Sequence, residues 1–335
     1  MMLAGENRSK RLTDLMGRPI TYLRVSLTQR CNLRCSYCYG SVKTLPGSDH
    51  QLSFSEILRL IQAFASLGVT KVRFTGGEPL LRTDIVDLVR QTSALEGISL
   101  VGLTTNGLIL EPILSPLIKA RLNSLNISLD TLSRETFQRI TGVDGFDRVY
   151  SAITSAEKSG AFDRVKINTV AMRGVNDGEI RHFALWALKR RIDLRFIEFM
   201  PAQGSSWGKA LFVGEDKIKS RIGLNLKEES IEGNDLGPAT SYSLPGAPGR
   251  ISFISAVSRS FCGRCNRLRL TSKGDLVGCL FLDNSADLNH LLADGAGTDE
   301  IAGAIRDIVA TSGFRRSPRE TSIVGFNPFM RRVGG

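Results

Sequence analysis

The sequence predicts an α/β protein, in which an incomplete, TIM-like (β/α)6 barrel precedes a smaller α+β unit. Between Tyr22 and about Ala202, strand-like and helix-like segments alternate six times, and such alternation predicts parallel strands covered by helices. A closed barrel has eight strand–helix repeats in about 250 residues, so six repeats predict an open one. We expect the barrel domain to cover residues 1–235 and the C-terminal domain to cover 236–335.

The predicted strands are short runs rich in β-branched and apolar residues. They cover residues 22–28, 69–75, 98–105, 124–130, 164–172 and 193–200. The first predicted helix begins at a capping box, Ser53 with Glu56, and ends at Gly68, because these residues suit the free backbone groups of the two helix ends. Further helices are predicted at 83–95, 113–120, 146–159 and 176–190.

The composition changes in the C-terminal third of the chain. Residues 204–248 are rich in Gly, Ser and Pro and predict a connection with one helix near 215–222. A strand is predicted at 251–257, followed by a hairpin that turns at Lys273 and Gly274. The last predicted helices cover 287–293 and 298–312.

Size and charge exclude several classes of protein. No apolar run among the 335 residues approaches the roughly 20 residues of a membrane span, and the N-terminal segment lacks the apolar core of a signal peptide. We therefore expect a cytoplasmic protein without a membrane segment. The net charge of +11 indicates an anionic partner. Because there is no basic ladder interleaved with aromatic residues, we expect a small polyphosphate and no nucleic acid.

The six cysteines form two triplets, and in a reducing compartment such grouping indicates metal binding. The first triplet, Cys31, Cys35 and Cys38, follows the first predicted strand. Three thiolates from one loop can hold three corners of a [4Fe–4S] cube, which usually takes four cysteines, so one iron would stay open to a ligand. The alternatives are a zinc knuckle, whose nearest further ligand would be the distant His50, or three unrelated thiols.

The second triplet, Cys262, Cys265 and Cys279, again offers three ligands and no obvious fourth. A zinc ribbon would need a second pair of closely spaced cysteines. We therefore expect a second iron–sulfur cluster with an open iron, and zinc with a borrowed ligand stays as the alternative.

Several cations occupy strands that should be buried. Arg24 and Arg73 lie on two of these strands, where a charge is costly unless it is paired. Lys166 and Arg195 lie on two more. The barrel interior is therefore expected to bind a multiply charged anion such as a triphosphate.

Arg267 and Arg269 alternate along one predicted strand of the C-terminal unit. Residues two apart in a strand project from the same face, so these two guanidinium groups can clamp an anion. The alternative is a strand face that is simply solvated.

Polar or glycine-rich residues follow the predicted strands, at the edge where such barrels place their chemistry. They are Gly76-Gly77-Glu78-Pro79, Thr104 to Gly107, Ser128 to Asp130, Lys166 with Asn168, and Met200. Each alone could be a turn or a helix cap, and Met200 could be core packing. The glycines would let a ligand approach the backbone, and the Glu78 carboxylate would suit a ligand ammonium group.

The first triplet, with Tyr37 between its last two cysteines and a strand before it, resembles the radical S-adenosylmethionine (SAM) superfamily. Taken in order over almost the whole chain, the motifs closely resemble those of the GTP 3′,8-cyclase family. The motifs that carry this likeness are residues 31–38, 73–80, 104–107, 128–132, 137–142, 165–170, 195–201, 261–271, 278–280 and the terminal Gly334-Gly335. Tyr39-Gly40 departs from the family, which usually has Met-Pro there.

The resemblance implies SAM and two [4Fe–4S] clusters as cofactors. It implies that SAM is cleaved at the first cluster to give a 5′-deoxyadenosyl radical. GTP, bound at the second cluster, would become 3′,8-cyclo-7,8-dihydro-GTP, the first intermediate of molybdenum-cofactor biosynthesis. The resemblance further implies a homodimer, an electron donor whose identity the sequence does not reveal, and transfer of the product to cyclic pyranopterin monophosphate synthase.

The resemblance also assigns site residues by motif. SAM would contact Tyr37, Gly77, Glu78, Ser128, Asn168 and Met200. GTP would contact Arg24, Lys71, Arg73, Thr104, Lys166, Arg195, Arg267, Leu268 and Arg269. Gly334 and Gly335 would reach into the active site, although a terminal Gly-Gly also occurs on sulfur-carrier proteins.

Two rival interpretations remain. A peptide-modifying radical SAM enzyme with auxiliary clusters generally needs more cysteines and gives no reason for inward arginines. A zinc-containing nucleic-acid-binding module explains the charge but not the residues at the strand ends.

Overall fold

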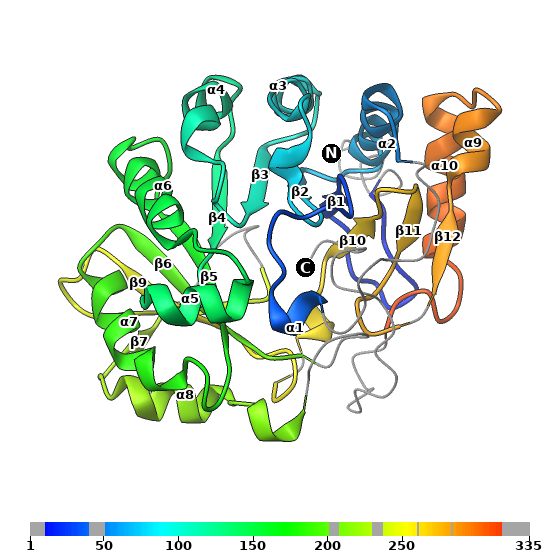
Figure 1. Cartoon of the computed structure of the whole chain (residues 1–335). Coiled ribbons are helices and arrows are strands. Elements are labelled where there is room, and N and C mark those ends of the chain that lie inside the picture. Colours follow the sequence, from blue (N-terminus) through cyan, green and yellow to red (C-terminus); the bar gives the residue numbers. More distant parts are fainter. Residues whose placement is uncertain are drawn as a thin grey trace, which may run out of the picture.

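The computed structural model describes residues 11–39, 51–200, 208–229, 237–259, 261–282 and 284–316. These residues form one curved sheet of twelve strands with helices on its outer side (Figure 1). Within these ranges, every helix is too short or too polar to span a bilayer. Gly40, Gly334 and Gly335, which the sequence analysis singled out, lie outside the described residues.

Six parallel strands form the centre of the sheet in chain order, which confirms the predicted partial barrel. They are β1 (Tyr22–Ser26), β2 (Lys71–Thr75), β3 (Leu100–Thr105), β4 (Ser124–Ser128), β5 (Val165–Ala171) and β6 (Ile192–Glu198). Because these strands run in one direction, their carboxyl ends meet at one rim, where barrel enzymes carry their active sites.

The predicted helices connect these strands on the outside of the sheet. They are α2 (Phe54–Ser66), α3 (Ile85–Ala94), α4 (Leu114–Lys119), α6 (Phe146–Lys158) and α7 (Ile180–Leu188), with the short turns η1 (Pro79–Leu81), η2 (Glu111–Ile113) and η3 (Asp177–Glu179). The capping box of α2 is present. Ser53 Oγ accepts from the Glu56 N–H at 3.3 Å, and the Glu56 carboxylate accepts from the Ser53 N–H at 2.7 Å.

Two helices are not predicted by the sequence pattern: α1 (Ser36–Tyr39) and α5 (Arg134–Thr141). The first is a single turn, too short to show a period. The second buries only Phe137, Ile140 and Thr141, and so few apolar positions give no clear helical repeat.

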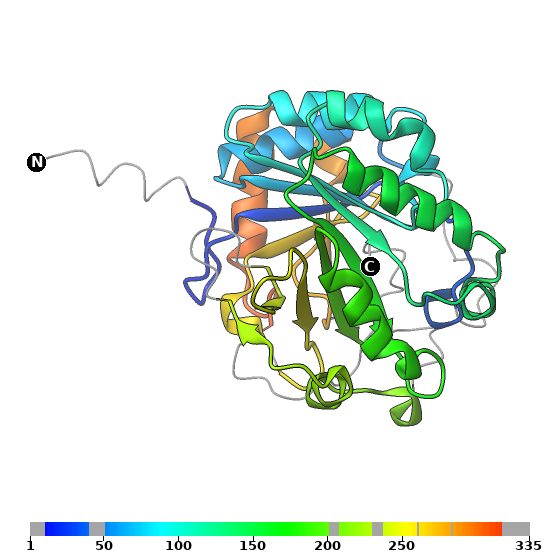
Figure 2. The same cartoon turned by 90° about the vertical axis from the view of Figure 1, so that its left-hand side faces the viewer.

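The C-terminal unit adds strands to both edges of the barrel. β9 (Arg250–Ile254) pairs in parallel with β6, and β10 (Arg267–Leu270) pairs in parallel with β1. Figure 2 shows β1, in dark blue, between β2 and the gold β10. Among the described strands, β9 and β10 do not pair with each other, so the barrel stays open between them.

The remaining elements follow β6 in the chain, and the strands among them extend the two edges of the sheet. They are the strands β7 (Lys227–Glu228), β8 (Thr240–Ser243), β11 (Asp275–Val277) and β12 (Ser285–Asp287), the helices α8 (Glu215–Ile222), α9 (Asn289–Ala293) and α10 (Thr298–Val309), and the turns η4 (Lys209–Leu211) and η5 (Cys262–Arg264). β10 and β11 form the predicted hairpin, with Gly274 at a φ of +90° in its turn. The C-terminal unit is therefore present, and it shares its sheet with the barrel.

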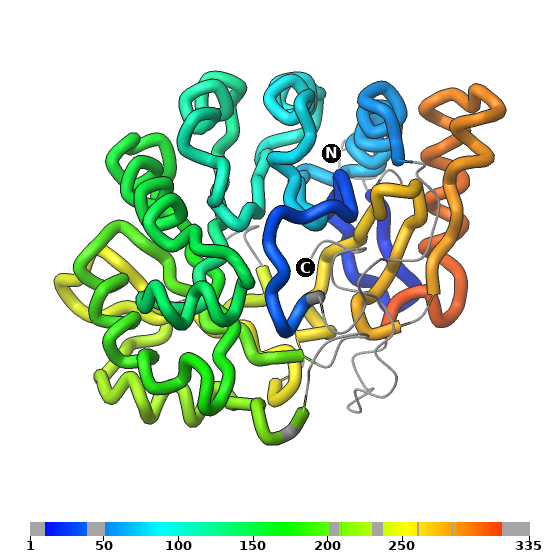
Figure 3. Tube along the Cα trace, in the orientation of Figure 1, coloured from blue at the N-terminus to red at the C-terminus, as the bar shows by residue number. Residues whose placement is uncertain are grey.

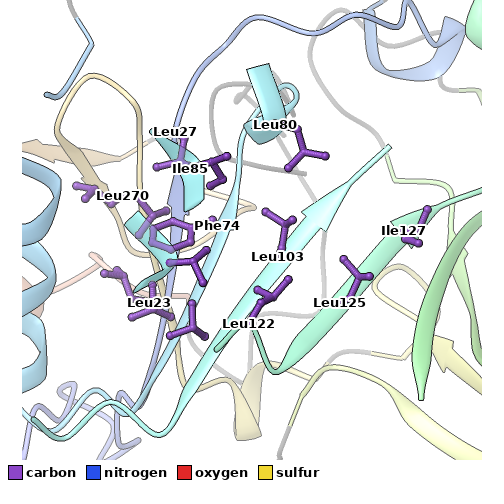
Figure 4. Packing of buried hydrophobic residues seen from close by; sticks show 14 of the residues in the cluster. Leu23, Leu27, Phe74, Leu80, Ile85, Leu103, Leu122, Leu125, Ile127 and Leu270 are labelled. Carbon is purple, nitrogen blue, oxygen red and sulfur yellow. The ribbon is translucent and has the colours of Figure 1, made fainter. Parts of the chain in front are cut away.

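The strands divide their side chains between a dry core and the barrel interior. Leu23, Phe74, Leu103 and Leu125 come from four neighbouring strands and pack together in the buried core (Figure 4). Burying one such side chain contributes about 1.5–3 kcal/mol. Successive residues of a strand point to opposite faces. Consequently the residues that alternate with this core, such as Arg73 beside Phe74, face the interior.

Candidate active site

A cavity of about 310 Å³ lies inside the barrel, which is in the size range of small-molecule sites. It brings together predicted residues from strands and loops that are far apart in the sequence. These are Cys31, Cys35, Cys38, Tyr37, Gly77, Ser128, Asn168, Met200, Arg24, Lys71, Arg73, Thr104, Lys166, Arg195, Arg267 and Arg269. Among the described residues, Glu78, Leu268 and the second cysteine triplet do not line it.

Cys31 and Cys35 lie between β1 and α1, and Cys38 lies in α1. Figure 3 shows this dark blue segment inside the arc of the outer helices. Cys31 Sγ accepts from the Leu33 N–H at 3.4 Å and from Asn106 Nδ2 at 3.8 Å. Asn106 Nδ2 also donates to Asn32 Oδ1 at 2.7 Å. The polar residues after β3 therefore hold the cysteine loop in place.

The three thiols of this loop are suited to bind separate irons of an iron–sulfur cluster. Burial raises the pKa of Cys35, and Asp130, Cys38 and Cys31 raise it further, so its thiolate needs a bound cation. In the described part of the chain, no three Cys, His, Asp or Glu side chains lie close enough to hold one ion. Zinc would need every thiolate at about 2.3 Å from one centre, whereas a cube spreads its cysteines over separate irons.

The two glycines after β2, Gly76 and Gly77, allow the segment that follows β1 to pack directly against them. A Cβ on Gly76 would lie 2.5 Å from the Thr28 carbonyl oxygen, and one on Gly77 would lie 2.1 Å from the Arg30 carbonyl oxygen. Gly76 also has a φ of +142°, which side chains rarely adopt. Any larger residue at either position would push the cysteine loop away from β2.

Glu78 is bound by the residues at the end of β3. Its fully buried carboxylate accepts from Thr105 Oγ1 at 2.7 Å, from the Asn106 N–H at 2.7 Å and from the Leu80 N–H at 3.1 Å. Burial raises the pKa of Glu78 to about 7, although these hydrogen bonds lower it. The side chain holds the end of β3 and does not line the cavity that the described residues form, and its contact with a ligand ammonium group stays a prediction.

Arg73 lines the cavity, but the protein uses most of its hydrogen bonds. Nε donates to the Tyr22 hydroxyl at 2.7 Å. Nη1 donates to the Leu103 carbonyl oxygen and to Asn126 Oδ1, both at 2.9 Å. Nη2 donates to Ser124 Oγ at 2.7 Å. Arg73 would therefore attract an anion mainly through its charge, because most of its N–H groups already donate to the protein.

The predicted guanidinium clamp is supported by the strand geometry. Arg267 and Arg269 both line the cavity, whereas Leu268 between them is fully buried in the core. Only the backbone of Leu268 is thus available to a ligand in the cavity. Arg269 is the neighbour of Arg24 on β1 in the register of the two strands.

The crowding of these arginines favours an anionic ligand. Burial lowers the pKa of Arg24 to about 10, and Arg267 and Arg73 lower it further while Tyr22 raises it. Burial also moves the pKa of Arg269 well below its usual range, and Arg24 and Arg267 add to this. An anion among these groups would relieve both the burial and the repulsion.

Arg195 lines the cavity and is already paired with an anion of the protein, while its contact with GTP stays a prediction. Its Nε and Nη2 donate to Asp193 Oδ2 at 2.8 and 2.6 Å, and Arg250 Nη2 donates to the same oxygen at 3.1 Å. Asp193 is two positions before Arg195 on the same strand face, a spacing that could have revealed it. Tyr22 has the same spacing from Arg24 and interacts with it, and this partner was not predicted from the sequence either.

Two polar atoms point to a ligand directly. Thr104 Oγ1 and Asn168 Oδ1 are buried, and neither has a hydrogen-bond partner among the described residues. Both residues line the cavity. Unsatisfied buried polar atoms are rare in folded proteins and costly, so these two are suited to bind part of a ligand.

The second cysteine triplet lies next to the cavity wall. Phe261 and Leu280, the neighbours of Cys262 and Cys279, line the cavity. Burial raises the pKa of Cys265, but Arg267 and Arg315 outweigh this and lower it to about 7. Such an electropositive setting favours the thiolate form that binds metal.

Comparisons with known proteins agree with this site. One family model, described as the Radical SAM superfamily, matches residues 25–187, and another, described as Molybdenum Cofactor Synthesis C, matches residues 192–317. The fold and the cysteine loop thus define a radical SAM enzyme, a class that uses SAM and an iron–sulfur cluster.

Individual relatives narrow the assignment. GTP 3′,8-cyclase of Thermodesulfovibrio yellowstonii is 43% identical over 298 residues, which cover 88% of this chain and 92% of that protein. GTP 3′,8-cyclase of Geobacter sulfurreducens is 43% identical over 284 residues, covering 84% of this chain and 86% of that protein. The chain belongs to the GTP 3′,8-cyclase family.

Other relatives are longer. Molybdenum cofactor biosynthesis protein 1 of Homo sapiens is 41% identical over 292 residues, which cover 87% of this chain but 46% of that protein. The chain therefore spans about half the length of these relatives. Among solved structures, SuiB of Streptococcus suis bound to its precursor peptide SuiA has a TM-score of 0.58 at 18% identity, covering 86% of this chain and 66% of that one. This likeness concerns the fold alone.

Proposed function

We propose that this enzyme converts GTP into (8S)-3′,8-cyclo-7,8-dihydroguanosine 5′-triphosphate, the first step of molybdenum-cofactor biosynthesis. One observation carries the proposal: the same cavity is lined by the first cysteine triplet and by the arginines of β1, β2 and β10. The relatives named GTP 3′,8-cyclase support the same substrate.

The cofactor assignments follow from the two triplets. Cys31, Cys35 and Cys38 would hold the first [4Fe–4S] cluster, and the second triplet would hold another, whose open iron would bind GTP. With SAM bound and one electron from an external donor, the first cluster would supply a 5′-deoxyadenosyl radical, the species able to take a hydrogen atom from C3′ of the GTP ribose. The spacing of the cysteines and the absence of a converging single-ion site among the described residues support clusters over zinc.

Residues of this chain would then position the reactants. Arg24, Arg267 and Arg269 would hold the triphosphate, because all three line the cavity and an anion there would offset the burial and mutual repulsion that lower the pKa values of Arg24 and Arg269. The Thr104 hydroxyl and the Asn168 amide would each gain the hydrogen bond that they lack. Fixing both reactants in contact lets the hydrogen transfer proceed without a diffusing radical.

The SAM side of the cavity would use Tyr37, Ser128, Met200 and the backbone of Gly77, all of which line it. The ring of Tyr37 packs edge-on against Phe199, with 6.2 Å between centroids. These side chains also help to exclude water, which protects a reactive intermediate from side reactions.

Cysteine variants test the separate roles proposed for the two clusters. Oxygen-free protein is incubated with GTP, SAM and dithionite, and the nucleotide products and 5′-deoxyadenosine are quantified. Cys31→Ala is expected to abolish SAM cleavage, whereas Cys262→Ala is expected to retain abortive cleavage without cyclised nucleotide. Full turnover by either variant would refute the proposal.

The cellular context forms a separate part of the proposal. We expect a cytoplasmic homodimer that receives electrons from a donor still to be identified and passes its product to cyclic pyranopterin monophosphate synthase. Light scattering of the purified protein tests the dimer, and a monomer at micromolar concentration would refute it.

A further inference from the structure

A buried cluster of three charges lies behind the second cysteine triplet. Asp14 Oδ2 accepts from Arg18 Nε at 2.7 Å and from Arg315 Nη1 at 2.8 Å. The side chains of Asp14, Arg18 and Arg315 are only 1%, 8% and 2% exposed. Asp14 Oδ1 also accepts from the Arg18 N–H at 2.9 Å, so the carboxylate is fully used inside the protein.

Both arginines extend from this carboxylate to the backbone of the triplet. Arg18 Nη1 donates to the Cys262 carbonyl oxygen at 2.6 Å, and Arg315 Nη2 donates to the Cys265 carbonyl oxygen at 2.6 Å. Arg18 Nη2 donates to the Arg316 carbonyl oxygen at 3.0 Å. Arg18 precedes the first barrel strand and Arg315 follows the last helix, so two segments far apart in the sequence hold the two ends of the η5 turn.

The third cysteine is held by the same C-terminal segment. The backbone N–H of Arg316 donates to the Cys279 sulfur. A Cβ on Gly278 would lie 2.1 Å from the Phe314 carbonyl oxygen, so residues 314–316 pass directly against the strand that precedes Cys279. Arg18 and Arg315 thus contact Cys262 and Cys265, and Arg316, the residue after Arg315, contacts Cys279.

Stability alone does not explain this arrangement. Buried ion pairs often stabilise a fold no better than apolar residues of similar volume, because removing charges from water is costly. This cluster holds two cations and one anion, which leaves one positive charge beside three cysteines. A positive charge there stabilises thiolates and any anionic group that they bind.

We propose that Asp14, Arg18 and Arg315 form a positioning clamp for the second triplet, which fixes the separation of Cys262 from Cys265 and raises the reduction potential of the cluster bound there. The proposal rests on the second cluster of the proposed function. Arg18 and Arg315 set the backbone geometry, and Asp14 orients both guanidinium groups while offsetting one of their charges.

The test isolates the second triplet. Cys31, Cys35 and Cys38 are replaced together by Ala, and the protein is reconstituted with iron and sulfide under nitrogen. Into this background are placed Arg315→Met, Arg315→Lys and Asp14→Asn. Arg306→Met and Asp307→Asn on the exposed face of α10 repeat the charge changes away from the triplet. Iron and sulfide content, the rate of cluster loss to a chelator and the midpoint potential are measured.

The clamp predicts opposite shifts for the two charge changes. Arg315→Met removes a cation and lowers the midpoint potential, whereas Asp14→Asn removes an anion and raises it, since net charge near a cluster sets its potential. Arg315→Lys keeps the charge but loses the forked geometry. Its potential should stay near that of the background, while its cluster is lost roughly tenfold faster, as for one lost charge-assisted hydrogen bond.

The outcomes separate the clamp from the proposed function. If the triple-alanine background binds no cluster although Asp14, Arg18 and Arg315 are intact, the second cluster itself is refuted. If the background binds a cluster and all three variants match the α10 controls in potential and in rate of loss, the clamp is refuted. Shifts of the same sign for Arg315→Met and Asp14→Asn would also refute it, because mere loosening of the fold has no charge dependence.

Discussion

The Tyr37 hydroxyl donates a hydrogen bond to Asp130 Oδ2 at 2.8 Å, joining the first cysteine loop to the residues after β4. Asp130 Oδ1 accepts from the Val170 N–H at 2.8 Å, so one carboxylate connects the loop with β5 as well. Burial raises the pKa of Asp130 to about 6, although both hydrogen bonds lower it. The position of the first triplet therefore depends on a buried carboxylate with few partners.

Tyr37→Phe should destabilise the protein by about 1–3 kcal/mol at pH 7, because a buried carboxylate oxygen loses its donor. Asp130 binds more protons folded than unfolded between its unfolded pKa near 4 and its folded pKa of about 6, so stability falls as pH rises through that window. Removing the donor raises the folded pKa further and extends the fall above pH 6. Urea unfolding from pH 4 to pH 8 measures this. An unchanged profile would contradict the prediction, and Asp130→Asn should flatten it.

Tyr22 should make anion binding depend on pH. Burial raises its pKa, but Arg73, Arg24 and Arg267 outweigh this and lower it to about 7. Below pH 7 the phenol is neutral and the arginines keep their full charge; above pH 7 the phenolate offsets one charge. GTP should therefore bind roughly fivefold more weakly at pH 8 than at pH 6, since one unit charge at contact contributes about 1 kcal/mol in a solvated site.

Titration calorimetry with wild type and Tyr22→Phe checks this prediction. The ionisation of GTP itself affects both proteins equally, so the difference between their pH profiles isolates the phenol. Parallel profiles for the two proteins would show that Tyr22 does not ionise in this range.

Gly102 on β3 leaves room for the Arg73 guanidinium. A Cβ at this position would lie 2.7 Å from Arg73 Cζ, and Arg73 is held by four hydrogen bonds. Gly102→Ala should displace Arg73, lower the unfolding free energy by about 1–3 kcal/mol through its lost bonds, and weaken GTP binding. Gly303→Ala in α10, where a Cβ meets nothing within 4 Å, is the matched control. Equal GTP affinity in the two variants would contradict the prediction.

The strand alternation made much of the site predictable. A period of two predicts that Arg267 and Arg269 share one strand face, and the presence of a charge on a buried strand predicts that Arg24 faces the interior. All three line the cavity. The alternation cannot show which of the charged side chains that face the interior is already hydrogen-bonded within the protein. Arg73 finds Asn126 53 positions away, and such a distance along the chain carries no local signal.

The pairing of the strands at the edges of the barrel could not be predicted from local sequence patterns. The runs that become β9 and β10 were recognised as strands, but their parallel pairing with β6 and β1 depends on where the chain returns in space. The partners of Glu78 are not visible locally either, because Thr105 and Asn106 lie at the end of the next strand.

Asp193 is the anion on which Arg195 and Arg250 depend. It is fully buried, and Ser252 Oγ donates to its Oδ1 at 2.6 Å. Burial would raise its pKa, but Arg195 and Arg250 outweigh this and hold the pKa far below the usual range. An acid whose folded pKa is depressed contributes stability above its unfolded pKa, near 4, and loses that contribution as the pH falls towards the folded value.

Asp193→Asn should lower the unfolding free energy by about 3–5 kcal/mol at pH 7, because two largely buried guanidinium groups lose their counter-ion. The difference from wild type should stay constant between pH 7 and about pH 4 and shrink below it, since wild-type Asp193 then begins to lose its advantage over the unfolded chain. Urea unfolding at pH 7, 5, 4 and 3 measures the difference. Asp87→Asn, which breaks an exposed pair with Arg90, should cost at most about 1 kcal/mol. A loss that is equally small at both sites would show that the Asp193 cluster does not stabilise the barrel.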